Sequence, residues 1–381
     1  MKRRTSLALC AALAGSALAP TPWAAAADPA PQAQVSTGVL NGAEFAVALP
    51  PGSWNHGVIM LAHGYRPQAA PLVADLHPER PSLKAFLGDG WIVATTSYRR
   101  NGIIVADAMA DLDALRAYIA ATYGEPARVI LSGDSMGGLI VALMAEREAG
   151  PYQGAVAFDP TLYLSEPNAT VGLSLLPRIP LLFVTTEKEA KQAIGYMTAL
   201  VARPAPAVPP ALFLISRQGH TNINQPERFG ALRAMDAWIE RGPGTLPSPG
   251  ENQHYFDATV KPEPGPSTAV MHADGRGFDT RVAEVDAIHG TVLLEAQAAD
   301  FNAVGITAMT YFRLGASGKT YRTLYGNNYS DVQSGLWVAF PDADGRTAMA
   351  RSFENAAATA GLRVGDTVSV QMQEPGPAGS R

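Results

Sequence analysis

The sequence feature that most constrains the fold is residues 129–140, where an apolar run stops at a Gly-Asp-Ser-Met-Gly motif and a second apolar run follows at once. This G-x-S-x-G pattern is typical of a nucleophile elbow, a strand-to-helix turn so sharp that the serine backbone is strained. Gly133 and Gly137 suit such a turn because a Cβ at either position is expected to collide with neighbouring backbone. We therefore expect the Ser135 hydroxyl at the tip of a sheet, above a helix N-terminus that favours developing negative charge.

The motif also has the flanks that an elbow needs. A G-x-S-x-G match alone is often an ordinary Gly/Ser loop, so these flanks carry the argument. Residues 128–131 form a buried-strand pattern, and residues 139–145 form a strongly apolar helix pattern that ends before Gly150 and Pro151. The sequence therefore predicts a strand, a turn at Ser135 and a helix.

Length and charge limit the classes of protein to consider. The chain has 381 residues, of which 47% are hydrophobic, and this is enough for a sizeable core and two domains. The net charge of -5 shows no excess of basic residues of the kind that binds nucleic acid, so we expect no nucleic-acid partner.

The N-terminus has the pattern of a cleaved signal peptide over residues 1–27. Basic residues 2–4 precede a short apolar run at 7–19, and alanines at 24–27 suit a cleavage site. The apolar run is too short to span a membrane. The only cysteine, Cys10, lies inside this segment, so the mature chain would have no disulfide and no thiolate metal site. We expect a periplasmic or extracellular protein with no membrane span.

The rest of the chain divides by its pattern into two folded parts. Apolar strands alternate with helical stretches over residues 28–241, with 28–42 as a loose lead-in, and this alternation predicts a doubly wound, mostly parallel α/β sheet. Residues 242–268 are rich in Gly and Pro and predict a linker. Short alternating runs over residues 269–381 predict a small β-rich, barrel-like domain with one helix at 348–360.

A serine hydroxyl needs a base and a carboxylate before it becomes a good nucleophile. His220 is the best base, because it follows a buried strand and Gly219 and precedes a helix. A single histidine without these flanking features more often has a structural role than a catalytic one. Three acids compete to orient it, and we favour Glu189 over the alternatives Glu187 and Asp159. Glu189 also fits a capping box that begins at Thr186, which would give it a purely structural role.

Acyl transfer also needs hydrogen-bond donors for the carbonyl oxygen as it gains charge. The first should be the backbone amide of Met136. The second should be the amide of Tyr65, in the loop after His63 and Gly64. Aromatic residues near strand ends favour an aromatic acyl group; these are Tyr65, Tyr98, Phe158 and Tyr163. No cluster of metal ligands and no cofactor motif is present in the sequence, so we expect neither a metal nor a cofactor.

Taken together, residues 35–241 resemble the α/β-hydrolase superfamily. The matching motifs are His63-Gly64-Tyr65, Gly133-Asp134-Ser135-Met136-Gly137-Gly138 and Gly219-His220. The resemblance implies an eight-stranded, mostly parallel sheet with an esterase-, lipase- or peptidase-like serine site. The family often has Gly-x-x-Asp after the strand that precedes the acid, whereas residues 186–189 here read Thr-Glu-Lys-Glu, which leaves the acid open.

The C-terminal part resembles a different family more weakly. Residues 325–332 and 355–366 look like parts of the C-terminal barrel of S-adenosylmethionine hydroxide adenosyltransferases. That barrel helps to hold the nucleoside only beside an N-terminal domain that this sequence lacks. We therefore interpret it as a β-module for substrate docking or for covering the site, without the cofactor.

The sequence thus predicts a secreted serine hydrolase that cleaves carboxylic esters, small or in a polymer chain, through an acyl-enzyme on Ser135 with His220 as base. The insertion at residues 161–178 is short compared with a lipase-type lid, so we expect an open site. A serine peptidase or amidase of the same fold is the nearest alternative. A non-catalytic ligand-binding protein is the alternative from another class.

Overall fold

The computed structural model describes residues 33–164, 172–201, 207–246 and 255–373. The predicted signal peptide at 1–27, with Cys10, lies outside these residues, as do parts of the 161–178 insertion and of the 242–268 linker. Within the described ranges, no helix is long and apolar enough to cross a bilayer.

The first folded part is built on a nine-stranded sheet with the order β1-β2-β4-β3-β5-β6-β7-β8-β9. The pairings of β2 with β1 and with β4 are antiparallel, and the pairings from β4 through to β9 are parallel. This confirms the doubly wound, mostly parallel sheet. The strands are β1 (Gln34–Leu40), β2 (Ala43–Leu49), β3 (Gly57–Ala62), β4 (Ile92–Thr96), β5 (Arg128–Asp134), β6 (Gly154–Phe158), β7 (Leu181–Thr186), β8 (Ala211–Ile215) and β9 (Phe256–Asp257).

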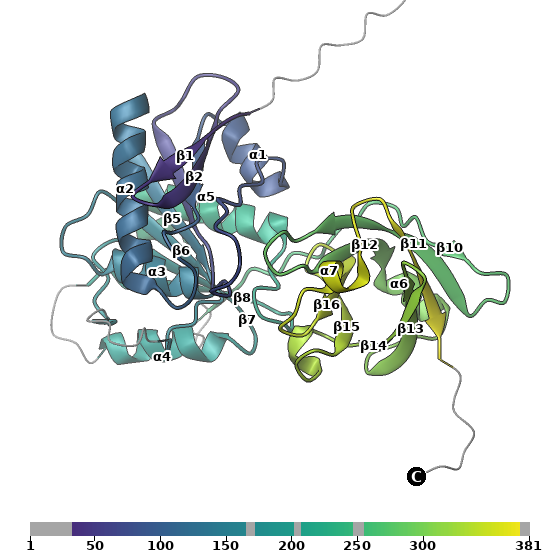
Figure 1. Cartoon of the computed structure of the whole chain (residues 1–381). Coiled ribbons are helices and arrows are strands. Elements are labelled where there is room, and N and C mark those ends of the chain that lie inside the picture. The colour runs from purple at the N-terminus through teal and green to yellow at the C-terminus, as the bar shows by residue number, and fades with distance from the viewer. Residues whose placement is uncertain (1–32, 165–171, 202–206, 247–254, 374–381) are drawn as a thin grey trace, which may run out of the picture. The chain divides into compact units, whose positions relative to one another are not determined.

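Helices cover both faces of this sheet (Figure 1). Side chains alternate between two apolar clusters along the strands, so Leu131 faces one cluster and its neighbour Ile130 faces the other. Helices α2, α3 and α4 pack into the first cluster, and α1 and α5 pack into the second. The helices are α1 (Pro81–Gly88), α2 (Val105–Tyr123), α3 (Met136–Ala145), α4 (Ala190–Val201), α5 (Gln225–Arg241) and the short η1 (Pro243–Thr245).

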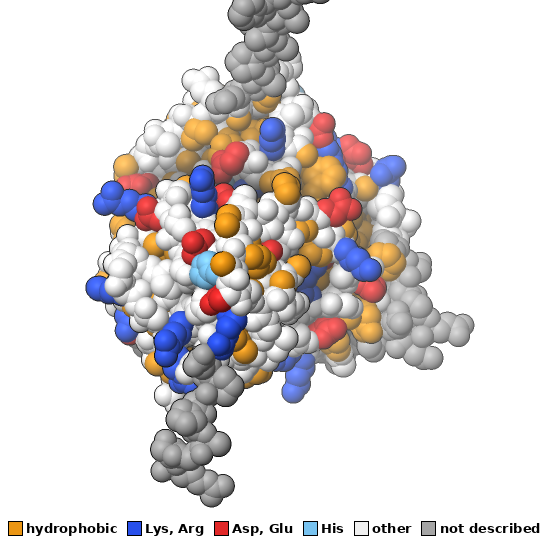
Figure 2. Space-filling view, turned by 90° about the vertical axis from the view of Figure 1, so that its right-hand side faces the viewer, with side chains coloured by type: hydrophobic (Ala, Val, Ile, Leu, Met, Phe, Trp, Pro, Cys, Tyr) orange, Lys and Arg blue, Asp and Glu red, His pale blue; other side chains and the backbone are white. Residues whose placement is uncertain are grey.

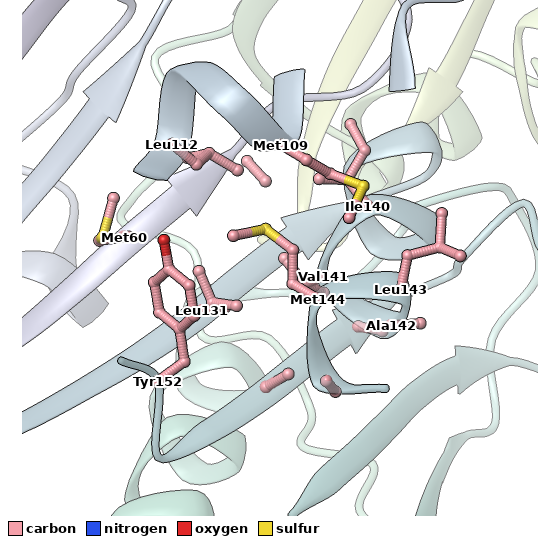
Figure 3. Close-up of a cluster of buried hydrophobic side chains, with 14 of the residues drawn as sticks. Met60, Met109, Leu112, Leu131, Ile140, Val141, Ala142, Leu143, Met144 and Tyr152 are labelled. Atoms are coloured by element: carbon pink, nitrogen blue, oxygen red, sulfur yellow. The ribbon is translucent and has the colours of Figure 1, made fainter. Parts of the chain in front are cut away.

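Helix α3 is the most deeply buried helix of this part. All ten of its residues are buried. Figure 3 shows Ile140 and Met144 of α3 among Met109 and Leu112 of α2 and Leu131 of β5. A helix that is apolar on every side must be enclosed by other elements, so the start of α3 is held firmly at the end of β5.

Two strands occur where composition predicted none. Residues 34–40, in the predicted lead-in, form the edge strand β1, whose side chains alternate between half-buried and exposed. Phe256 and Asp257, in the predicted linker, form β9 and pair with β8, so the sheet has nine strands where the resemblance implied eight. An exposed edge strand and a two-residue strand both lack the apolar run that identifies a buried strand.

The second folded part is a closed β-barrel, as the β-rich pattern predicted. Seven strands follow the order β11-β12-β16-β15-β14-β13-β17, and β17 pairs back with β11 to close the ring. Phe278, Phe301 and Phe312 pack edge to face in its core. The strands are β10 (Val270–Met271), β11 (Gly277–Val285), β12 (Val292–Gln297), β13 (Thr310–Ala316), β14 (Lys319–Tyr325), β15 (Trp337–Pro341), β16 (Arg346–Arg351) and β17 (Thr367–Met372).

The helix predicted at 348–360 is wrong over its first half. Residues 346–351 form β16, and only Ala356–Ala360 form a helix, α7. Alanine favours a helix in isolation, but here pairing with β12 and β15 and burial in the barrel decide the conformation. The remaining short elements are α6 (Ala298–Ala303) and η2 (Tyr329–Asp331).

Charges of both signs are interspersed on the face of the molecule shown in Figure 2. Basic and acidic side chains lie next to one another among the described residues of this face, with apolar atoms between them.

The close packing of the elbow yields a stability prediction at Gly137. A Cβ at this position would overlap the carbonyl oxygen of Ala62 at the end of β3. Backbone atoms of a central strand cannot move away cheaply, so we expect Gly137→Ala to lower the free energy of unfolding by about 4 kcal/mol or more. Urea unfolding monitored by circular dichroism measures this loss.

Gly230→Ala is the matched control. Gly230 is exposed on α5, and a Cβ there would meet nothing within 4 Å. Alanine is the better helix former, so this variant should be as stable as the wild type or more stable by about 1 kcal/mol. Equal stability of the two variants would contradict the packing argument.

Candidate active site

Ser135 lies at the junction of β5 and α3 in a strained conformation. Its φ is 56° and its ψ is -115°, a region that residues other than glycine rarely occupy. Its amide donates to the carbonyl of Phe158 at the end of β6, 3.0 Å away. The strand, the sharp turn and the helix thus present the Ser135 side chain at the N-terminus of α3, as an elbow requires.

His220 lies within hydrogen-bond distance of Ser135. The separation between His220 Nε2 and Ser135 Oγ is 2.8 Å. His220 is in the loop between β8 and α5, directly after Gly219, which has a φ of 106°. The next amide, that of Thr221, donates to Asp159 Oδ2 at 2.6 Å, which anchors the loop that carries His220 to the end of β6.

The three candidate acids occupy different positions around His220. Glu189 Oε1 is 3.4 Å from His220 Nδ1, and about a quarter of each side chain is exposed. Glu187 accepts a hydrogen bond from Gln218 Nε2 at 2.5 Å. Asp159 accepts from backbone amides. Of the three acids, Glu189 is therefore the one that faces the second ring nitrogen of the histidine.

Thr186 does not serve the capping box that was the structural alternative for Glu189. Its hydroxyl donates to Asp159 Oδ2 at 3.1 Å, and α4 begins only at Ala190. The other oxygen of the Glu189 carboxylate, Oε2, accepts a hydrogen bond from Gln192 Nε2 at 3.1 Å. The Glu189 side chain is thereby held toward the histidine by the first turn of α4.

Asp159 joins the loop that carries Glu189 to the loop that carries His220. Its buried carboxylate accepts from the amide of Thr186 at 2.7 Å and from the amide of Thr221 at 2.6 Å. Burial raises the pKa of Asp159 to about 7, against the opposite effect of these two amides. The structure thus gives Asp159 backbone partners on both loops.

The two amides predicted to hold an oxyanion come from separate elements. Met136 is the first residue of α3, and Tyr65 follows His63 and Gly64 in the loop after β3. Gly64 lies against the elbow, since a Cβ placed there would be 3.4 Å from the Ser135 Cβ. Neither amide donates to another of the described residues. The Met136 side chain is buried in the core, so only its backbone faces the site.

The aromatic lining predicted from strand ends is wrong for two of its four residues. Tyr98 is 0% exposed and Phe158 is 1% exposed, so neither can contact a substrate. Tyr65 and Tyr163 are 49% and 77% exposed. Neighbouring loops and helices cover most strand ends in a doubly wound sheet. Sequence position alone does not show which strand ends are buried and which are exposed to solvent.

Two residues beside the nucleophile escaped the sequence analysis. Thr161 Oγ1 lies 3.1 Å from Ser135 Oγ. Arg228, on α5, donates to the Asp134 carboxylate at 2.7 Å and stacks over the Phe158 ring at 4.7 Å. Neither residue belongs to a motif, although Thr161 directly follows the Asp159-Pro160 turn and that position is the signal that could have found it.

A cavity of about 250 Å³ lies beside the elbow. Its walls include His63, Asp134 and Arg228, together with His289 from the loop after β11. Neither Ser135 nor His220 is among its described lining residues. The cavity is therefore separate from the atoms that would react. Among the described residues, the cavity included, no group of three or more His, Cys, Asp or Glu side chains is arranged to hold a metal ion.

His63 lies between two backbone carbonyls in the loop that precedes Tyr65, and its neutral ring can donate to one of them. Its Nδ1 is 2.7 Å from the Gly64 oxygen, and its Nε2 is 3.1 Å from the Ser97 oxygen. The ring stacks on Tyr98 with 3.9 Å between centroids. Burial, and then the charge of Arg66, lower the pKa of His63 to about 4, so the imidazole is neutral at physiological pH.

One family model matches part of this chain. The family is described as "Serine aminopeptidase, S33", and the match covers residues 104–199. That range contains α2, β5, the elbow, α3 and Glu189, but it is less than half of the chain. No curated protein sequence matches.

Several solved structures resemble parts of this chain at low sequence identity. An uncharacterized conserved protein from Thermotoga maritima is 18% identical with a TM-score of 0.26, and the match covers 30% of this chain and 40% of that one. Dipeptidyl peptidase 4 of Porphyromonas gingivalis is 14% identical, with coverage of 55% and 35% and a TM-score of 0.42. A hyperthermophilic esterase from the archaeon Pyrobaculum calidifontis is 15% identical, with coverage of 56% and 85% and a TM-score of 0.38. The chain thus spans well under half of the first two proteins, and its substrate has to be argued from its own site.

The neutral state of His63 predicts acid sensitivity. Its folded pKa lies below the ordinary 6.5, so the unfolded chain binds more protons between pH 6.5 and about 4. Stability is therefore full above pH 6.5 and falls as the pH drops toward 4, by roughly 3 kcal/mol from this residue. Urea unfolding of wild type and His63→Gln across this range should show the steeper loss in the wild type. Parallel losses would contradict the prediction.

Proposed function

We propose that this chain, an α/β hydrolase by its fold, is a serine hydrolase that cleaves carboxylic esters through an acyl-enzyme on Ser135. The observation that carries the proposal is the 2.8 Å separation between Ser135 Oγ and His220 Nε2. Behind it, Glu189 Oε1 faces His220 Nδ1 at 3.4 Å. A nucleophile, a base and an orienting carboxylate in this order form a working unit for acyl transfer.

Each residue then has one role in the reaction. Ser135 Oγ attacks the ester carbonyl while its proton passes to His220 Nε2. Glu189 accepts from Nδ1–H, which keeps the correct tautomer and stabilises the imidazolium. His220 then gives the proton to the departing alkoxide, and the acyl group stays on Ser135. Water attacks this acyl-enzyme with His220 again as base, which releases the acid and restores Ser135.

The oxyanion would be held by the amides of Met136 and Tyr65. Both amides are without acceptors among the described residues, so they are free to donate to a substrate oxygen. The N-terminus of α3 adds a favourable dipole at the same place. Fixed donors of this kind cost no reorganisation during the reaction.

Esters are proposed ahead of amides on chemical grounds. An alkoxide leaves a tetrahedral intermediate more easily than an amide nitrogen, which must be protonated first. A site able to cleave amides therefore also cleaves matched esters, whereas the reverse need not hold. The description of the matched family as serine aminopeptidases makes an aminoacyl amide the second candidate substrate.

Export and substrate type complete the proposal. The basic, apolar and alanine-rich segments of residues 1–27 support secretion to the periplasm or beyond. The exposed rings of Tyr65 and Tyr163, with a short insertion after Thr161, support an open site. An open site suits small esters or esters within a polymer chain.

Hydrolysis of matched p-nitrophenyl esters and aminoacyl p-nitroanilides by wild type and Ser135→Ala tests the function. We expect the wild type to cleave the esters and Ser135→Ala to lose at least about 1000-fold in kcat/KM, because the nucleophile is absent. Faster cleavage of the anilides would select the aminopeptidase candidate. An inactive wild type that also resists a fluorophosphonate probe would select the non-catalytic binding protein.

The acid assignment makes a separate prediction. Glu189→Gln should lower kcat/KM for the best ester by about 100- to 10,000-fold, because the amide cannot stabilise the imidazolium. Glu187→Gln is the matched control on the same loop and should stay within about threefold of the wild type, since Gln218 rather than His220 is its partner. A larger loss in Glu187→Gln would move the acid role to that residue.

Asp159→Asn tests whether Asp159 anchors the two loops or acts as the acid that orients His220. Asn has only one acceptor oxygen for the two amides that donate to Asp159, so this variant should lose thermal stability. Glu189→Gln should unfold at the wild-type temperature. A stable but inactive Asp159→Asn would instead favour Asp159 as the acid.

A further inference from the structure

The turn after β6 brings a second hydroxyl-bearing residue, Thr161, to the nucleophile Ser135. The amide of Thr161 donates to the carbonyl of Ser135 at 3.1 Å. Its side-chain oxygen, Oγ1, lies 3.1 Å from Ser135 Oγ. Thr161 thus contacts both the backbone and the reacting atom of the residue proposed to attack the substrate.

The arrangement of protons decides which hydroxyl donates. Glu189 faces His220 Nδ1, so in the neutral ring Nδ1 carries the proton and Nε2 is an acceptor. Ser135 has a single hydroxyl proton, which is directed at Nε2 across 2.8 Å. The remaining hydrogen bond to Ser135 Oγ must then be donated by Thr161. Among the described residues, Ser135 Oγ is the only partner of the Thr161 hydroxyl.

We propose that Thr161 is a further catalytic residue, which donates a hydrogen bond to Ser135 Oγ and stabilises the negative charge that develops there. This role rests on the proposed function of Ser135. As the Ser135 proton passes to His220, Oγ gains charge and the hydrogen bond from Thr161 strengthens, because a charged acceptor forms a shorter and stronger bond. Thr161 keeps its own proton throughout.

The same contact acts in the second half of the reaction. When water has attacked the acyl-enzyme, the bond between the carbonyl carbon and Ser135 Oγ breaks, and Oγ again carries negative charge until His220 returns the proton. Thr161 can stabilise that charge from the same position. Acylation and deacylation should therefore both depend on its hydroxyl.

The position of Thr161 is set by the fold before any substrate binds. Pro160 restricts the backbone of the turn, and Asp159 is fixed by the amides of Thr186 and Thr221. The Thr161 amide is itself bonded to Ser135. Such prior fixation is what makes a donor effective at a developing charge.

Two substitutions separate the hydroxyl of Thr161 from its methyl group. Thr161→Val keeps the branched shape and removes the hydroxyl, whereas Thr161→Ser keeps the hydroxyl and removes the methyl. We expect the second-order rate of Ser135 labelling by a fluorophosphonate to fall about 10- to 100-fold in Thr161→Val and less than about threefold in Thr161→Ser. The burst and steady-state rates with p-nitrophenyl acetate should follow the same order.

Other outcomes would overturn the proposal. If Thr161→Ser were the slower variant, packing of the methyl group would be the role of Thr161. If both variants reacted at the wild-type rate, the hydroxyl would have no catalytic role. Thermal unfolding of each variant shows whether a rate loss comes from unfolding, which would also count against the proposal. Failure of the wild type to be labelled would overturn the assignment of Ser135 as the nucleophile. This outcome needs no variant, so it is distinguished from a failure of the Thr161 proposal.

Discussion

The contact between the first turn of α3 and the end of β3 is the constraint on which the candidate site depends. Gly137 touches the carbonyl of Ala62 so closely that no side chain fits between them. This contact leaves β5 no room for a gradual transition into α3, so the change of direction falls on Ser135 and its φ becomes 56°. Burial of every residue of α3 holds the strained residue in place.

The other site residues reach Ser135 because parallel strands end at the same edge of the sheet. The loops after β6, β7 and β8 carry Thr161, Glu189 and His220 in turn. Asp159 links the last two loops through two amides and belongs to the same turn as Thr161. The buried carboxylate of Asp159 thus fixes three loops relative to one another without touching the nucleophile.

Features determined by local pattern were predictable from sequence. Gly133, Ser135 and Gly137 identify the turn because their spacing meets a steric demand that few other structures make. Apolar runs located the buried parallel strands for a similar reason, and alternation predicted the barrel. The edge strand Gln34–Leu40 was missed because its exposed side chains give no such run. The alanine-rich stretch 348–360 was assigned to a helix, although barrel pairing places its first four residues in β16 and only its end forms α7.

Features that depend on distances between loops were not predictable. Three carboxylates follow two neighbouring strands, and sequence order could not say which faces the histidine. The structure separates them, since only Glu189 lies beside His220 Nδ1 while Gln218 and the backbone amides engage the other two. Thr161 carries no motif at all, and its contact with Ser135 becomes visible only when β5 and β6 lie side by side.

The closure of the barrel has a consequence for the order in which the chain can fold. Strand β17 pairs with β11, so Gly277 meets Gln371 across most of the length of the second part. The nine-stranded sheet, in contrast, has all of its strands by Asp257. A ribosome or export channel that releases the chain from its N-terminus can therefore deliver a complete α/β sheet while the barrel is still an open ribbon. Pairings between such distant residues also form slowly, so the barrel should be the last part to become native.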